Sequence, residues 1–148
     1  MVTPYFLPPK RLKWALLKAK KRGVEVKITI TGESDVPLVQ NVSLSYLPRL
    51  MKKGIRFFAY NAGVCHAKYA IVDGRWAMLG SANLDYLSLL HNKEGNLLIK
   101  NRQIIKKLEN IFKDNLKNST KFEPEFWETL PLRTKLSGYL GRLFKKMM

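Results

Sequence analysis

Apolar residues recur along the chain with two different periods. Short stretches in which apolar residues alternate or run together predict strands, and longer stretches with an apolar residue every three or four positions predict helices. Strands are predicted at residues 2–7, 24–30, 55–60, 67–72, 75–79 and 94–100, and helices at residues 8–22, 42–53 and 101–116, with a short helix or turn at residues 84–90. Because strands alternate with helices, we expect an α/β fold with a central mixed β-sheet flanked by helices.

Two stretches interrupt this pattern of strands and helices. Pro48 is expected to bend or divide the helix at residues 42–53. Residues 31–40 are polar and are predicted to form a loop after a strand. Ligand sites in α/β proteins lie at the ends of strands. Ser34 and Asp35 are therefore candidate site residues, with an ordinary turn as the alternative.

The last segment, residues 133–148, has five basic residues and no acidic one. Its apolar residues follow a helical period and form one stripe, made of Leu136, Tyr139, Leu140, Leu143, Phe144 and Met147. Gly138 and Gly141 lower the helix propensity of this segment in water, so we expect that binding stabilises the helix. We divide the chain into a half-domain at residues 1–118 and a basic amphipathic extension at residues 119–148.

Two partners suit this C-terminal helix. It could dock on its own domain or on another protein. It could also lie on an anionic membrane, with the stripe in the lipid and Lys145 and Lys146 reaching the aqueous phase.

The charge of the whole chain is strongly positive. Its 148 residues include 27 Lys and Arg against 11 Asp and Glu, a net charge of +16. The positive electrostatic field of such a charge attracts nucleic acid, anionic lipid or an acidic partner. No apolar stretch approaches the ~20 residues that span a bilayer, and prolines interrupt the first apolar run, so we expect no signal peptide and only peripheral membrane contact. The single cysteine, Cys65, excludes an internal disulfide.

One segment gathers side chains that suit a phosphodiester. On a strand, His66 and Lys68 point to the same side, ~7 Å apart. Asp73 and the glycine after it predict a hairpin, which returns a second strand towards Ser81 and Asn83. An imidazole can attack phosphorus or protonate a leaving oxygen, and the other groups can hold phosphoryl oxygens. We expect neither a metal nor another cofactor.

Taken singly, each of these residues has an ordinary explanation. Asp73 suits a hairpin turn, Lys68 a solvated strand edge, and His66 an unspecialised histidine. Cys65 precedes His66 but faces the other way on a strand, which disfavours a Cys–His pair. His91 lies in a polar stretch and is expected to be exposed.

The combined spacing of these residues closely resembles the phospholipase D superfamily. The residues that carry the resemblance are His66, Lys68, Asp73, Gly80, Ser81 and Asn83. Residues 3–8, 32–35 and 83–97 are similar to bacterial cardiolipin synthases. The resemblance covers nearly the whole chain but only the second half of such an enzyme, which uses two motifs for each active site.

This resemblance implies transfer of a phosphatidyl group between two phosphatidylglycerol molecules through a phosphohistidine, giving cardiolipin and glycerol. His66 occupies the position of the acid/base, and Lys68, Ser81 and Asn83 would hold the phosphoryl oxygens. Asp73 belongs to the motif, with a catalytic or a purely structural role. Glu94 would accept a proton from an imidazole and fix its tautomer.

Because the sequence carries a single motif, the source of the second motif stays open. A second copy in a homodimer, or a separate N-terminal half, would supply the other motif. The chain starts within the strand that opens this half in relatives, which suggests a split or truncated synthase. We expect it at the cytoplasmic face of the cell membrane. Two other functions fit: a homodimeric nuclease of the phospholipase D type, and an inactive half-domain that binds anionic membrane or a partner.

Overall fold

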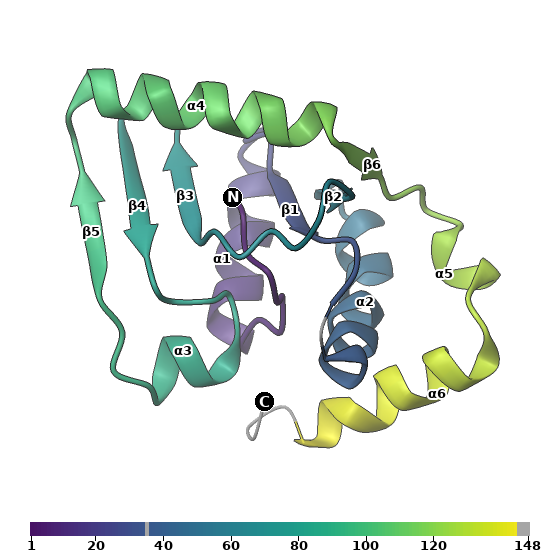
Figure 1. Cartoon of the computed structure of the whole chain (residues 1–148). Helices are drawn as coiled ribbons and strands as arrows, with labels where there is room; N and C mark the ends of the chain where they lie inside the picture. The colour runs from purple at the N-terminus through teal and green to yellow at the C-terminus, as the bar shows by residue number, and fades with distance from the viewer. Residues whose placement is uncertain (35, 145–148) are drawn as a thin grey trace.

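The computed structural model describes residues 1–34 and 36–144. Its helices and strands are, in chain order, α1 (Lys10–Lys21), β1 (Lys27–Thr31), α2 (Pro37–Met51), β2 (Arg56–Tyr60), β3 (Tyr69–Val72), β4 (Trp76–Gly80), α3 (Tyr86–Leu90), β5 (Asn96–Ile99), α4 (Arg102–Lys117), β6 (Ser119–Lys121), α5 (Phe126–Thr129), α6 (Leu132–Gly141) and the 3-10 helix η1 (Arg142–Phe144) (Figure 1).

The strands form two groups of three that the N-terminal segment links. β1 and β2 are parallel, and β6 pairs antiparallel with β2. β3, β4 and β5 form an antiparallel group in that order. Val2 bridges Thr29 of β1 and Tyr69 of β3, so the N-terminus runs between the two groups (Figure 1). The predicted mixed sheet with flanking helices is confirmed. The regular strand predicted at residues 2–7 is wrong, because only isolated bridges form there.

Apolar side chains from the N-terminal segment, α2, β1 and β2 form the main core. Phe6, Ile28, Leu47 and Phe57 are buried together, and the rings of Phe6 and Phe57 meet edge to face at 5.2 Å. These residues pack α2 against β1 and β2. A smaller cluster packs α4 on the second group of strands through Ala77, Ile105 and Leu108. Each group of strands is therefore packed against a helix, the first against α2 and the second against α4.

Several boundaries differ from the predictions. α2 begins at Pro37, because proline suits the first turn of a helix, so the predicted loop at residues 31–40 is shorter. Pro48 lies within this one helix and does not divide it. β6 was not predicted, since Asn118, Ser119 and Thr120 are polar. Its pairing with β2 is a long-range contact that local sequence does not reveal.

The C-terminal helix α6 packs on α2 through its glycines. A Cβ atom at Gly138 would lie 2.6 Å from the carbonyl oxygen of Asn41, and one at Gly141 would meet the side chain of Val42. Arg142 extends this contact, since its Nε donates to Ser45 Oγ at 2.8 Å. This packing fits the alternative in which the helix docks on its own domain, and stabilisation of the helix by a further binding partner stays a prediction.

The apolar stripe of the C-terminal segment stays largely outside this contact. Its described members Leu136, Tyr139, Leu140, Leu143 and Phe144 are all at least half exposed. Lys145, Lys146 and Met147 lie outside the described residues, as does Asp35. Within the described ranges, no helix has the length and apolar character needed to cross a membrane.

Candidate active site

The hairpin of β3 and β4 carries the motif. Asp73 and Gly74 have φ values of +52° and +63°, as a type I′ turn requires. The Arg75 amide donates to the Val72 carbonyl at 2.9 Å, and Val72 pairs with Trp76. Asp73 is thus at the far tip of the hairpin, about 17 Å along an extended chain from Lys68. The structure does not bring Asp73 to the other motif residues.

His66 and Lys68 lie just before β3, which begins two residues later than predicted. The His66 side chain is exposed, whereas Lys68 is only 9% exposed. Lys68 Nζ donates to the His66 carbonyl oxygen at 2.7 Å, and the Gly80 amide donates to the Lys68 carbonyl at 3.1 Å. Burial lowers the pKa of Lys68, and the nearby Glu94 opposes that shift. The largely buried Lys68 side chain is therefore anchored on the backbone of His66, whose own side chain is exposed.

Ser81 and Glu94 meet where β4 and β5 come together. The Ser81 amide donates to the Gly95 carbonyl at 3.0 Å, the Gly95 amide donates to Ser81 Oγ at 3.0 Å, and Ser81 Oγ donates to the Glu94 carboxylate. A Cβ atom at Gly80 would collide with the Gly95 backbone, so only glycine permits this approach. Hydrogen bonds from Ser81 and Ser88 lower the pKa of Glu94. Within this chain the Glu94 carboxylate therefore orients the Ser81 hydroxyl.

Asn83 is held by a buried acid that sequence reasoning did not single out. Asp85 is 6% exposed and caps α3, accepting from the Ser88 amide at 2.7 Å. The Asn83 side chain also donates to it, while burial raises the pKa of Asp85. Asn83 Oδ1 is buried without a hydrogen-bond partner among the described residues. An Asp before an apolar helical turn is an N-cap signal that could have identified this residue.

The remaining candidates lie apart from this cluster. Ser34 Oγ accepts from the Val36 amide at 3.1 Å, which is an ordinary turn. His91 is exposed, as predicted, and stacks on Tyr86 with ring centroids 5.3 Å apart. Among residues 1–34 and 36–144, no three His, Cys, Asp or Glu side chains gather as metal ligands would.

The hydrogen bonds and charges described above bring Lys68, Ser81 and Glu94 into one cluster beside His66, with Asn83 held next to it. An ammonium and a hydroxyl suit the oxygens of a phosphate, and an imidazole suits proton transfer or attack. Among residues 1–34 and 36–144, one imidazole, that of His66, lies at this cluster.

Comparison with known proteins agrees with this chemistry. A family model described as "Cardiolipin synthase, PLD-like domain" matches residues 1–116. The chain is 32% identical over 148 residues to the "Probable cardiolipin synthase YwiE" of Bacillus subtilis (strain 168), a match that covers the whole chain but 30% of that protein. The chain thus spans less than a third of this relative's length and corresponds to a C-terminal part of it.

Solved structures share the fold. The phospholipase D family member Nuc from Salmonella typhimurium superposes with a TM-score of 0.71 at 25% identity, over 83% of this chain and 80% of that one. The phosphatidylserine synthase of Haemophilus influenzae gives a TM-score of 0.79 at 19% identity, over 99% of this chain and 40% of that one. This chain therefore belongs to the cardiolipin synthase family with a phospholipase D-like domain.

Proposed function

We propose that this chain supplies one half of the active site of a phosphatidyltransferase that makes cardiolipin from phosphatidylglycerol. The observation that carries this proposal is the hydrogen bond from the Lys68 ammonium to the backbone of the exposed His66, next to the Ser81–Glu94 pair. The family match and the resemblance of the whole chain to part of the Bacillus protein support the lipid substrate.

In this mechanism His66 is the acid/base. A histidine of the complementing polypeptide attacks phosphorus, and the bond from phosphorus to the glycerol oxygen breaks as His66 donates a proton to that oxygen. The neutral imidazole of His66 then takes the proton of the incoming phosphatidylglycerol hydroxyl, whose oxygen displaces the first histidine from phosphorus. Lys68 stabilises the negative charge that builds on the phosphoryl oxygens. Ser81 and Asn83 would orient the same oxygens.

We propose that a second motif completes this site, since these 148 residues carry one motif. The exposed His66 side chain leaves room for a partner at the site. The partner is either a second copy of the chain or a separate polypeptide with the other half.

We further propose that the chain acts at the cytoplasmic face of the membrane as a peripheral protein. The exposed leucines of α6 and η1 would enter the lipid surface, and the net charge of +16 would attract anionic lipid.

The test is a transfer assay with two single-histidine variants. His66→Ala should lower cardiolipin formation by about 10²–10⁴-fold, the usual contribution of a general acid/base. His91→Ala is the matched control and should retain activity, since His91 is exposed and only stacks on Tyr86. Each variant is assayed with labelled phosphatidylglycerol in mixed micelles, together with the complementing polypeptide. Equal activity of His66→Ala and the unaltered chain would overturn the assignment, and cleavage of DNA without lipid transfer would favour the nuclease.

A further inference from the structure

One side of α1 concentrates positive charge. Residues 10–22 hold seven Lys and Arg, and the first acid along the chain is Glu25. An α-helix turns by about 100° per residue, which places six exposed side chains of α1 and its C-terminal cap within one third of the helix circumference. We call these residues the α1 cationic face; they are Lys10, Arg11, Trp14, Lys18, Lys21 and Arg22.

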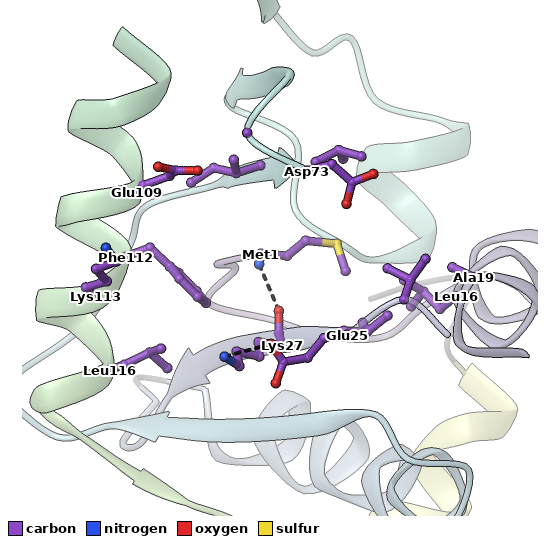
Figure 2. Close-up of a pocket in the computed structure, with 15 residues that line it drawn as sticks. Met1, Leu16, Ala19, Glu25, Lys27, Asp73, Glu109, Phe112, Lys113 and Leu116 are labelled. Carbon is purple, nitrogen blue, oxygen red and sulfur yellow. Dashed lines mark hydrogen bonds and ion pairs between the residues drawn. The ribbon is translucent and has the colours of Figure 1, made fainter. Parts of the chain in front are cut away.

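The opposite side of α1 faces the interior of the chain. Leu16 is 7% exposed, and Figure 2 shows Leu16 and Ala19 of α1 turned towards Phe112 and Leu116 of α4. Because the helix is anchored on this side, the α1 cationic face is directed towards the solvent.

The charge of the α1 cationic face is not balanced by acids of the chain. Glu25 forms its ion pairs with Lys27, at 3.0 Å, and with Arg56. Among residues 1–34 and 36–144, no ion pair joins an acid to a member of the α1 cationic face. These cations are therefore available to an anionic partner.

A tryptophan lies among these cations. Trp14 is 61% exposed, and Lys18 Nζ lies 3.6 Å from the centroid of its ring. Tryptophan is enriched at the headgroup level of membranes because it combines an apolar ring with a polar N–H group. An exposed indole bordered by cations therefore suits the headgroup layer of an anionic bilayer.

The first turn of α1 lies near the catalytic cluster. The Leu7 amide donates to the carbonyl of Leu84, the residue that follows Asn83, at 3.0 Å, and α1 begins three residues after Leu7. Figure 1 shows α1 beginning at the end of the molecule where α3 and α6 lie, with α4 at the opposite end. A membrane that contacts this end would bring lipid headgroups close to the site.

The same turn of α1 adjoins the exposed apolar residues of η1. Lys13 Nζ and Arg142 Cζ both lie over the Tyr46 ring, 4.9 and 4.5 Å from its centroid. Directly after Arg142, Leu143 and Phe144 are 76% and 57% exposed. Residues 129–144 hold three Lys and Arg and no acid. Cations and exposed apolar side chains thus occur together at this end of the molecule.

We infer that the α1 cationic face binds the headgroups of anionic lipids through its first turns, with the Trp14 indole at the headgroup level and η1 in the adjoining lipid. The inference deepens the proposed peripheral attachment and rests on it. It assigns the electrostatic attraction to one helix instead of the net charge of the chain. Exposed aliphatic side chains beside cations suit a bilayer better than a nucleic acid, whose phosphate backbone offers no apolar layer.

The first test removes two charges from either end of the molecule. The double variant Lys10→Gln, Arg11→Gln alters the α1 cationic face, and the matched control Lys107→Gln, Lys113→Gln alters two exposed lysines of α4. Sedimentation with mixed phosphatidylglycerol and phosphatidylcholine vesicles measures both affinities. We expect the α1 variant to bind about tenfold to thirtyfold more weakly, as expected for two cations at an anionic surface. The control should change by at most about threefold, because salt screens distant charges.

The second test follows the tryptophan itself. The double variant Trp76→Phe, Trp127→Phe keeps Trp14 as the single indole, and Trp14→Phe, Trp127→Phe keeps Trp76 beside the β3–β4 turn. With phosphatidylglycerol vesicles, we expect the fluorescence of Trp14 to shift to the blue and to be quenched by lipids brominated on their acyl chains. The fluorescence of Trp76 should stay unchanged.

These readouts measure binding and are independent of turnover. Equal weakening by the two charge variants, an unchanged Trp14 emission, or binding to duplex DNA but not to vesicles would overturn the inference. If those results came with cardiolipin formation in the presence of the complementing polypeptide, the proposed function would stand and the α1 contact alone would be refuted. The expected Trp14 shift without any cardiolipin formation would support the α1 contact and refute the proposed catalytic function alone.

Discussion

The site depends on a few side chains that hydrogen bonds hold in defined orientations. Lys68 is nearly buried, its ammonium donates to the His66 carbonyl, and the negative charge of Glu94 opposes the lowering of its pKa by burial. Ser81 forms hydrogen bonds with the backbone of Gly95 and with the carboxylate of Glu94. The carboxylate of Glu94 therefore links the hydroxyl and the ammonium that would face a phosphate.

Replacing this carboxylate tests that link. In Glu94→Gln the shape is preserved but the negative charge is lost, which weakens the hydrogen bond from Ser81 because charge-assisted hydrogen bonds are the stronger ones. We expect kcat for lipid transfer to fall by roughly tenfold to a hundredfold, with little change in thermal stability. Glu123→Gln is the control, since Glu123 pairs with Lys121 away from the site. Equal kcat values in the two variants would show that Glu94 does not support the site.

At the scale of elements, helices and strands approach closely where glycine leaves space. Gly80 permits β4 to reach Gly95, and Gly138 and Gly141 permit α6 to lie on α2. The glycines of α6 therefore serve packing, although they lower helix propensity. The same packing turns the leucines of α6 and η1 outward, where they are available to a lipid surface.

Filling the space at Gly138 should separate the two helices. Gly138→Ala would place a methyl group 2.6 Å from the Asn41 carbonyl oxygen, a contact that backbone cannot easily relieve. We expect the free energy of unfolding to fall by about 1–3 kcal/mol, although alanine favours helix. Arg133→Ala, an exposed change on the same helix, should stay within about 0.5 kcal/mol. Urea unfolding measures both, and a more stable Gly138→Ala variant would contradict the packing.

The outward leucines give a second element-scale prediction. The double variant Leu140→Gln, Leu143→Gln should bind anionic phosphatidylglycerol vesicles roughly tenfold or more weakly, because each buried leucine contributes about 1.5–3 kcal/mol. The matched control changes Leu97 and Leu98 of β5, which are exposed to a similar degree, and should bind like the unaltered chain. Vesicle sedimentation measures the affinities. An unchanged affinity in the first variant would refute lipid contact by α6.

At the scale of the whole molecule, the sequence predicted the order of helices and strands better than it predicted which distant strands pair. The order of helices and strands follows from apolar periodicity, and the motif spacing identified His66, Lys68, Ser81 and Asn83. β6 was missed because its pairing depends on β2, some 60 residues earlier in the chain. The division of the chain at residue 118 stays a prediction.

The central claim is that this chain holds half of a phosphatidyltransferase site, and a titration tests it most directly. A fixed amount of the chain is mixed with increasing amounts of a separate polypeptide, made of the part of the Bacillus subtilis relative that precedes its matched segment, and cardiolipin formation from phosphatidylglycerol is measured. Activity should rise to a plateau at equal amounts of the two if the separate half completes the site, or be present without it if a second copy of the chain does, and in both cases it should be lost with His66→Ala. Cardiolipin formation that His66→Ala leaves unchanged would contradict the claim.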